Sequence, residues 1–252
     1  MRPLRFRFAL VWLVALTAPA LAGVPAGFAY LCDVDPSIVQ DMRYAGSNNF
    51  TGAPLPGYDA AECVLRREAA EALRQVQADL APQHLGLKVY DCYRPTRAVA
   101  AFARWAHAPE QAGAPTKRFY PALDKRRLFA EGYIAAHSVH SAGIAVDLTL
   151  VPLPPTSVPA FDPAARYGSC TASAAKRAPD NSIDMGTGFD CFDAKSRTAS
   201  DGLMPEQERW RGLLVAAMRK RGFHNYFREW WHFSYGPHPR ALYDFPIAPR
   251  SH

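Results

Sequence analysis

Apolar residues recur at helical spacing in three parts of this chain. The first stripe runs at positions i, i+4, i+7 and i+11 and predicts a helix that ends before Gly86; its members are Ala69, Leu73, Val76 and Leu80. A second helix is predicted over 98–105. The third stripe lies within 210–218 and stops at Gly222, after three basic residues that suit the negative end of a helix.

Three other segments are predicted to be strands. Residues 87–93 lead up to Pro95, residues 144–151 are rich in branched side chains, and residues 223–235 return after the last helix. The piece from 152 to 182 holds several prolines and no periodicity, which is typical of a lid, a binding loop or disorder. Because helices and short strands are interleaved, the sequence predicts one α+β domain with a small, largely antiparallel sheet packed by helices.

The N-terminus has the pattern of a secretory signal. Arg2, Arg5 and Arg7 precede an almost wholly apolar stretch, and Ala20-Leu21-Ala22 is a small-residue cleavage site. We therefore predict a cleavable signal peptide over 1–22 and a mature domain over 23–252, located in the periplasm or secreted; an uncleaved anchor is the alternative. No later segment approaches the ~18 apolar residues of a membrane helix, so no membrane span is expected after cleavage.

The charge of the chain does not favour nucleic acid as a partner. The 252 residues include 29 Lys+Arg and 23 Asp+Glu, and removal of three arginines with the signal lowers the net charge from +6 to +3. The basic residues are scattered among acids, whereas a nucleic-acid surface needs them clustered. A composition with 49% hydrophobic residues fits an ordinary globular domain with one core, and it leaves the oligomeric state open.

All five cysteines lie beyond the signal, in a compartment where disulfides can form. None has zinc-finger spacing. Cys170 and Cys191 flank the irregular stretch and could be bonded, and Cys63 could pair with Cys92. An odd number leaves at least one thiol, for which Cys32 is the candidate, and the connectivity stays open.

Two short segments carry metal chemistry. His140 precedes Asp147 by seven residues, and Glu229 precedes His232 by three. Two histidines and one aspartate provide three ligands for a divalent metal, and zinc held by three side chains keeps a fourth position open for water. The remaining acid, Glu229, is suited to take a proton from that water. His137 is the alternative histidine in the first segment.

These segments resemble those of a known enzyme family. The pattern S-x-H-x-x-G-x-A-x-D over 138–147, E-x-W-H over 229–232 and YDCYRP over 90–95 are similar to zinc D,D-peptidases, and specifically to VanX-type D-alanyl-D-alanine dipeptidases. The resemblance implies the hedgehog/DD-peptidase-like fold and hydrolysis of the free dipeptide D-alanyl-D-alanine, a small-molecule substrate. It also implies one zinc ion per chain, bound by His140, Asp147 and His232, and Glu229 as the general base.

The resemblance assigns roles to further residues. Arg94 is expected to stabilise the oxyanion that forms as water adds to the peptide carbonyl. Ser138 corresponds to a hydroxyl that helps to hold the dipeptide, Tyr44 to a residue at one end of the substrate, and Asp190 to the carboxylate that receives the substrate's ammonium group. The family usually has glycine where this chain has Cys92, a difference that is compatible with a disulfide.

Two other functions compete with this interpretation. A D,D-carboxypeptidase that trims peptidoglycan stem peptides uses the same zinc motifs, although Asp190 and Tyr44 argue against it. A wall-binding protein with a non-catalytic metal site is the second alternative, and the presence of Glu229 argues against that one. The sequence also poses a geometric problem: residues at i and i+3 of a strand face opposite sides, so the strand must begin after Glu229 or a bulge must redirect one side chain before His232 can share its metal.

Overall fold

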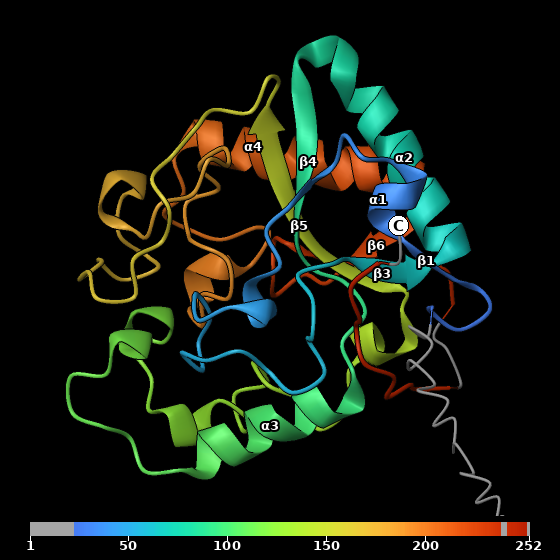
Figure 1. Ribbon diagram of the computed structural model, residues 1–252. Helices are drawn as coiled ribbons and strands as arrows, with labels where there is room; N and C mark the ends of the chain where they lie inside the picture. The colour runs from blue at the N-terminus through green and yellow to red at the C-terminus, as the bar shows by residue number, and fades with distance from the viewer. Residues whose placement is uncertain (1–22, 238–240, 251–252) are drawn as a thin grey trace, which may run out of the picture.

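A five-stranded sheet forms the centre of the protein, whose computed structural model describes residues 23–237 and 241–250 (Figure 1). The predicted signal peptide over 1–22 lies outside these residues. In the strand order β2-β4-β5-β7-β6, β2 runs parallel to β4 and every other pair is antiparallel. The strands are β2 (Val39–Gln40), β4 (Leu85–Asp91), β5 (Ala145–Pro152), β6 (Phe223–Asn225) and β7 (His232–Tyr235). The predicted α+β fold with a largely antiparallel sheet is confirmed.

Two helices cover one face of this sheet. Helix α2 (Arg67–Leu80) packs beside β4 and against α4 (Pro205–Lys220), which crosses behind β4 and β5 in Figure 1. The apolar stripe predicted for the first helix is buried along its whole length. Helix α4 begins earlier than its stripe, because Pro205 occupies the first helical turn, where its missing N–H costs nothing. It ends as predicted, with Gly222 at φ +87° just beyond it.

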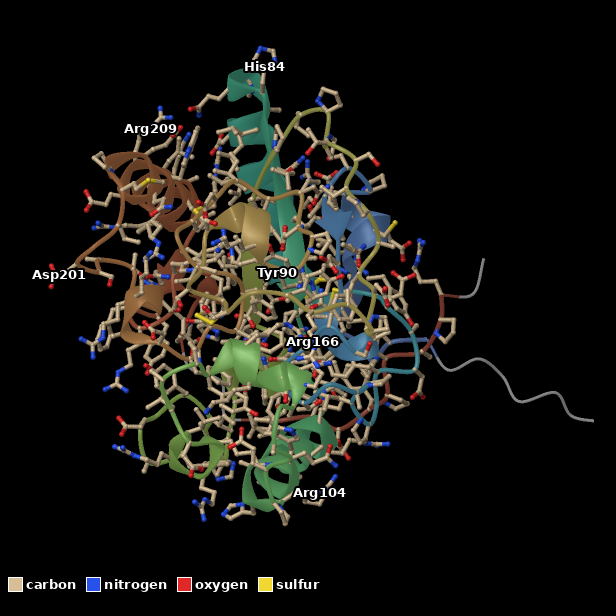
Figure 2. All side chains as sticks on the ribbon, turned by 90° about the vertical axis from the view of Figure 1, so that its left-hand side faces the viewer. His84, Tyr90, Arg104, Arg166, Asp201 and Arg209 are labelled. Atoms are coloured by element: carbon tan, nitrogen blue, oxygen red, sulfur yellow. A yellow bond between two sulfur atoms is a disulfide. The ribbon has the colours of Figure 1, made fainter. Side chains whose placement is uncertain are left out.

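Every residue of β4 is buried, since both faces of the strand are covered. Leu87 and Val89 belong to the apolar core, while Lys88 and Tyr90, on the alternate face, both reach Asp180 of the irregular segment. Figure 2 shows Tyr90 inside the molecule, His84 at the tip of the turn between α2 and β4, and Arg104 on α3 at the opposite end.

Helix α3 (Thr96–His107) lies apart from the sheet, below its lower end in Figure 1. It begins directly after Pro95 and buries Phe102 towards the space between the helix and the sheet. The first residues of β5, at the lower end of the sheet, face the same space, and the candidate site described below lies there.

The prediction of a single strand over 223–235 is wrong. The chain makes a hairpin instead, in which β6 and β7 pair antiparallel and residues 226–231 form the connection. Glu229 N–H donates to the carbonyl of Tyr226, and His232 N–H donates to the carbonyl of Glu229, so the connection is a compact turn. The strand that carries His232 therefore begins after Glu229, which is the first of the two solutions that the i, i+3 spacing required.

The remaining segments are short or irregular. Strand β1 (Phe28–Tyr30) pairs with β3 (Val64–Arg66) in a separate two-stranded sheet next to helix α1 (Leu31–Val34). The piece from 152 to 182 contains one 3₁₀ turn, η6 (Ala174–Lys176). Further 3₁₀ turns are η1 (Arg43–Ala45), η2 (Ala81–Gln83), η3 (Pro115–Phe119), η4 (Lys125–Arg127), η5 (Val139–Ala142) and η7 (Ala194–Ser196). Among the described residues, no helix combines the length and the apolar character needed to cross a membrane.

The structure contains both of the disulfide pairings that the sequence left open as candidates. Cys63 is bonded to Cys92, which ties β3 to the segment after β4, and Cys170 is bonded to Cys191, which ties the irregular piece to the segment before η7. Cys32 is the remaining thiol.

Candidate metal centre and active site

A 3₁₀ turn, η5, holds His140 at the lower end of the sheet. Ser138 caps the turn by accepting a hydrogen bond from the backbone N–H of His140 at 3.3 Å. Gly143 closes it with φ +75°, and a Cβ atom there would lie 2.3 Å from the ring of Phe28. Glycine is therefore required at this position both for its backbone angle and for the close approach of the aromatic ring.

The backbone fixes which nitrogen of His140 is free. Its Nδ1 lies 2.7 Å from the carbonyl oxygen of Cys92, and a carbonyl can only accept, so Nδ1 carries the proton. Nε2 is then the nitrogen with a lone pair. A backbone carbonyl behind a histidine is the usual way in which proteins orient a metal-binding imidazole.

The lone pair of His140 points at the two other predicted ligands. Asp147 is the third residue of β5 and stands opposite His232, the first residue of β7, in the sheet register. His140 Nε2 lies 3.1 Å from His232 Nδ1 and 3.3 Å from Asp147 Oδ1, and the last two atoms are 3.0 Å apart. The structure thus brings all three predicted ligand residues into one cluster.

The dimensions of this triangle fit a small divalent cation. Ligands at 2.0–2.1 Å from a tetrahedral centre are separated by about 3.3–3.4 Å, close to the separations of 3.0–3.3 Å found here. Two imidazole nitrogens and one carboxylate oxygen are also the donor set of zinc and of similar transition metals. His137, the alternative histidine, is exposed and lies outside the cluster.

Glu229 lies beside the cluster. Its carboxylate is 4.0 Å from His232 Nδ1, and burial raises the pKa of Glu229 to about 7, against the opposing effect of His232. The two adjacent tryptophans separate in space: Trp231 lines the same cavity, whereas Trp230 points away and donates to Thr187 Oγ1 at 2.8 Å. Trp231 therefore contributes an apolar wall to the site, whereas Trp230 packs in the protein interior.

Arg94 enters from the end of β4 and is held by a residue that sequence reasoning did not single out. Its Nε and Nη2 lie 2.9 and 2.8 Å from Oδ2 of Asp91, a fully buried carboxylate whose other oxygen accepts a 2.6 Å hydrogen bond from Tyr58. Arg94 Nη2 is also 3.6 Å from Asp147 Oδ2. Asp91 was visible in the motif around Arg94, but nothing local indicated that it would turn inward.

A second pair closes the cavity. The hydroxyl of Tyr44 donates to Asp190 Oδ2 at 2.7 Å, and both side chains are buried. Burial, followed by the negative charge of Asp147, raises the pKa of Asp190 well above its ordinary value. Asp190 has φ +55°, a backbone angle that few residues other than glycine adopt, and this angle indicates that its orientation is imposed by the fold.

All eight predicted site residues line one cavity of about 460 Å³ between α3 and the sheet. Ser138 lies on its wall, where its hydroxyl also caps η5. The wall includes residues that the sequence did not indicate, because they come from helices and loops without polar motifs: Phe102, Tyr133, Ile134, Phe192 and Tyr226.

Comparison with known proteins identifies the family. The profile of the peptidase M15 family, described as D-ala-D-ala dipeptidase, matches residues 25–154 and 167–248. This chain belongs to that family. It is 33% identical to a D-alanyl-D-alanine dipeptidase of Enterococcus faecium over 223 residues, which cover 88% of this chain and 98% of the relative. A protein of the same name from Streptomyces coelicolor is 34% identical over the same shares, and one from Escherichia coli is 28% identical over 81% of each chain.

Membership makes this M15 protein an enzyme of a metal-dependent peptidase family, in agreement with the cluster of two histidines and an aspartate. The two matched stretches are interrupted over 155–166, within the proline-rich piece between β5 and the segment that carries Asp190. This part of the chain therefore departs most from the family.

Proposed function

We propose that the protein hydrolyses the free dipeptide D-alanyl-D-alanine to two molecules of D-alanine, with zinc as its metal. The observation that carries the proposal is the triangle of His140 Nε2, Asp147 Oδ1 and His232 Nδ1, with the carboxylate of Glu229 beside it in one cavity. The names of the relatives, which are similar over nearly their full length, support this substrate.

Zinc bound by these three side chains would polarise the peptide carbonyl and lower the pKa of water to roughly 7. Zinc fits the donor set better than magnesium or calcium, which prefer oxygen ligands. All three side chains line the cavity, so a metal held by them would have room for water or substrate at a fourth position, as a catalytic rather than structural site requires.

Glu229 acts as the general base in this proposal. A buried carboxylate whose pKa is raised towards neutrality can both accept a proton from the attacking water and return it to the leaving amine. Arg94, aligned by Asp91, donates to the carbonyl oxygen as negative charge develops on it.

Asp190 and Tyr44 make the enzyme selective for a free amino end. A buried carboxyl with a raised pKa is costly to ionise alone, and an ammonium group placed beside it stabilises the charged form. A longer peptide brings no ammonium to this point and leaves Asp190 without that partner. The pair thus favours a dipeptidase over a carboxypeptidase that acts on stem peptides.

We also propose that the enzyme works outside the cytoplasm, in cell-wall peptide turnover or glycopeptide resistance. The N-terminal pattern of basic, apolar and small residues supports export. The two disulfides support an oxidising compartment as well.

The test compares substrates that differ at the amino end. Zinc-loaded protein is incubated with D-Ala-D-Ala, with its N-acetyl derivative and with a stem pentapeptide. A charge-assisted hydrogen bond contributes ~1.5–3 kcal/mol, so acetylation should lower kcat/KM at least roughly tenfold.

Asp190→Asn should lose activity on the free dipeptide and reduce the difference in kcat/KM between the free and the acetylated dipeptide. Asp193→Asn is the matched control, because Asp193 caps η7 outside the cavity. This variant should keep the full difference in kcat/KM between the two dipeptides. If the wild-type protein cleaved the free and the acetylated dipeptide equally fast, the proposal would be wrong and the protein would be a carboxypeptidase.

A further inference from the structure

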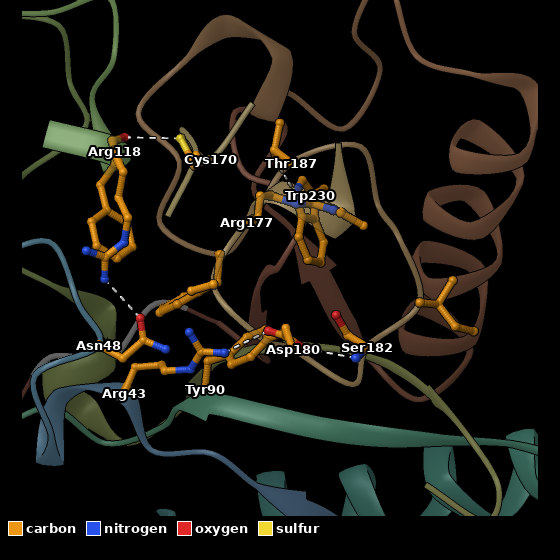
Figure 3. A pocket seen from close by; sticks show the side chains of 17 residues that line it. Arg43, Asn48, Tyr90, Arg118, Cys170, Arg177, Asp180, Ser182, Thr187 and Trp230 are labelled. Carbon is orange, nitrogen blue, oxygen red and sulfur yellow. Dashed lines mark hydrogen bonds and ion pairs between the residues drawn. The ribbon is translucent and has the colours of Figure 1, made fainter. Parts of the chain in front are cut away.

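Figure 3 shows a second cavity, two of whose lining residues are sequence neighbours of residues that line the first cavity. The second cavity has a volume of about 70 Å³, enough for several water molecules or one small ion. Adjacent residues face the two cavities in opposite directions: Phe189 and Trp230 line the second cavity, while Asp190 and Trp231 line the first. The second cavity is otherwise bounded by β4, η3 and the irregular piece that precedes Asp190.

Three arginines line this cavity, and each has unused capacity to donate hydrogen bonds. Arg43 is only 7% exposed and its buried Nε has no partner. Arg177 pairs with Asp184 through Nη2, but its buried Nη1 has no partner either. Unpaired buried donors are rare in folded proteins and call for an acceptor that completes them.

Arg118 is the unpaired cation of the group. Its two terminal nitrogens donate to neutral oxygens, those of Pro115 at 3.0 Å and of Asn48 at 3.1 Å, and within 23–237 and 241–250 it meets no carboxylate. Figure 3 shows its guanidinium pointing from η3 towards Asn48, beside which Arg43 lies. Burial, followed by the nearby charge of Arg43, lowers the pKa of Arg118, as expected for a cation that lacks a counterion.

The acids around the cavity are already engaged. Asp180 accepts hydrogen bonds from Lys88, from Arg43 at 2.7 Å and from Tyr90 at 2.8 Å. Asp184 accepts from Arg177, from the N–H of Gly186 and from the side chain of Gln207. Together with Asp41, which pairs with Arg43, three carboxylates face four cations, namely Arg43, Lys88, Arg118 and Arg177. One positive charge is left over at Arg118.

We propose that this cavity binds a small oxyanion, a carboxylate or an inorganic phosphate, between Arg43 and Arg118. A planar guanidinium matches the oxygens of both groups, and a single negative charge balances the surplus. Apolar walls from Phe119, Ile183 and Phe189 limit the rest of the ligand to a small group. The site is separate from the metal cluster and does not depend on the proposed peptidase activity.

The oxyanion also joins segments that are far apart in the chain. Arg43 belongs to η1, Arg118 to η3 and Arg177 to the irregular piece over 152–182. Binding should therefore stabilise the fold and close the irregular piece against the sheet.

The experiment measures thermal unfolding of the zinc-loaded protein in sodium acetate, sodium phosphate and sodium chloride at equal ionic strength and pH. An anion at about ten times its dissociation constant should raise Tm by roughly 3–6 °C over chloride. A rise with both oxyanions supports the shared chemistry, and a rise with only one identifies the source as carboxylate or phosphate. No rise with either overturns the proposal.

Arg118→Gln should abolish the rise. The matched control is Arg126→Gln, which removes the same charge from a side chain that is 77% exposed and should keep the full rise. Because Arg118 does not line the metal cavity, this dependence separates the proposed site from oxyanion binding to zinc. A rise that persists in Arg118→Gln overturns the assignment.

A second measurement on the wild-type protein does not require a variant to fold. Arg166 and Lys176 are exposed trypsin sites on the irregular piece. A protease cleaves a folded segment through its locally opened state, so an anion that binds only the closed state, at ten times its dissociation constant, should slow cleavage about elevenfold relative to chloride. An unchanged cleavage rate also overturns the proposal.

Discussion

Asp91→Asn isolates the contribution of the residue that aligns Arg94. The substitution keeps the volume of a fully buried side chain and removes its charge. The hydroxyl of Tyr58 can turn to accept from the new amide nitrogen, so the amide oxygen stays available to Arg94. The two contacts of 2.9 and 2.8 Å to Arg94 then change from an ion pair to hydrogen bonds between a charged donor and a neutral acceptor.

The expected loss can be worked out from these contacts. Hydrogen bonds that involve a charged group contribute ~1.5–3 kcal/mol; loss of the acceptor's charge moves each contact from the upper to the lower part of this range, a loss of about 1 kcal/mol per contact. Two contacts amount to about 2 kcal/mol, or roughly thirtyfold in kcat if Arg94 acts on the transition state. KM should change little, because the ground-state carbonyl carries little charge.

The assay measures kcat and KM on D-Ala-D-Ala at saturating zinc, with zinc content determined by elemental analysis. Saturating zinc is needed because a released Arg94 can move towards Asp147 Oδ2, now 3.6 Å away. Asp79→Asn is the matched control, since Asp79 pairs with Arg221 and Lys220 far from the cavity. A kcat within twofold of wild type in a fully zinc-loaded Asp91→Asn protein would refute the reasoning.

Three further predictions concern the metal, the base and the buried charges. His140→Ala and His232→Ala should each lose zinc as well as activity; full zinc in both variants, measured by elemental analysis, would reject the ligand assignment. Glu229→Gln should keep zinc while kcat falls by roughly 10²–10⁴, and a fully active variant would place the base elsewhere. Burial alone would raise the pKa of Asp180, but Arg43 and Lys88 outweigh burial and hold this pKa below the ordinary value of 3.8. The stability that ionised Asp180 contributes is therefore present above pH 3.8 and is lost as the pH falls below that value. In urea titrations, Asp180→Asn should therefore lower the free energy of unfolding at pH 7 by about 3–5 kcal/mol, and this free energy should then fall less steeply towards acid pH. A variant with the stability of the wild-type protein at pH 7 would show that Lys88 does not need this partner.

The helices could be predicted because their signal is local. The stripe from Ala69 to Leu80 repeats at the helical period over three turns, and the residues that the period selects are the ones the fold buries. The start of α4 at Pro205 was missed because its first turn is polar and carries no stripe. The short elements between residues 28 and 66 were also missed, since two- and three-residue strands are too short to show a period.

The hairpin at 223–235 shows a different limit. Both strands are short, and the connection is as aromatic as they are, so composition alone could not separate one strand from two. The i, i+3 spacing of Glu229 and His232 did indicate that a single regular strand could not hold both residues. A regular strand cannot direct both side chains to one metal, and the fold resolves the conflict with a turn between them.

The candidate ligands could be predicted because they lie in two short motifs whose order resembles that of the zinc D,D-peptidases. Their partners could not, because the contacts span the chain: Tyr58 reaches Asp91 across 33 residues, and Tyr44 reaches Asp190 across 146. Such pairings depend on how the elements are assembled, which no local pattern encodes. The arginine cluster of the second cavity is of the same kind, since its members come from three separate segments.

Cys92 supports the metal cluster through its backbone and a disulfide through its side chain. Its contribution to the metal cluster is a carbonyl oxygen that accepts from His140 Nδ1, and any residue supplies that carbonyl. The side chain is therefore free to vary, and here it forms the bond to Cys63. The backbone N–H of Tyr93 donates to the carbonyl of Val64 at 2.8 Å, so the disulfide reinforces a contact that the backbone already makes. The disulfide thus adds a covalent tether next to His140 and leaves in place the hydrogen bond that orients its ring.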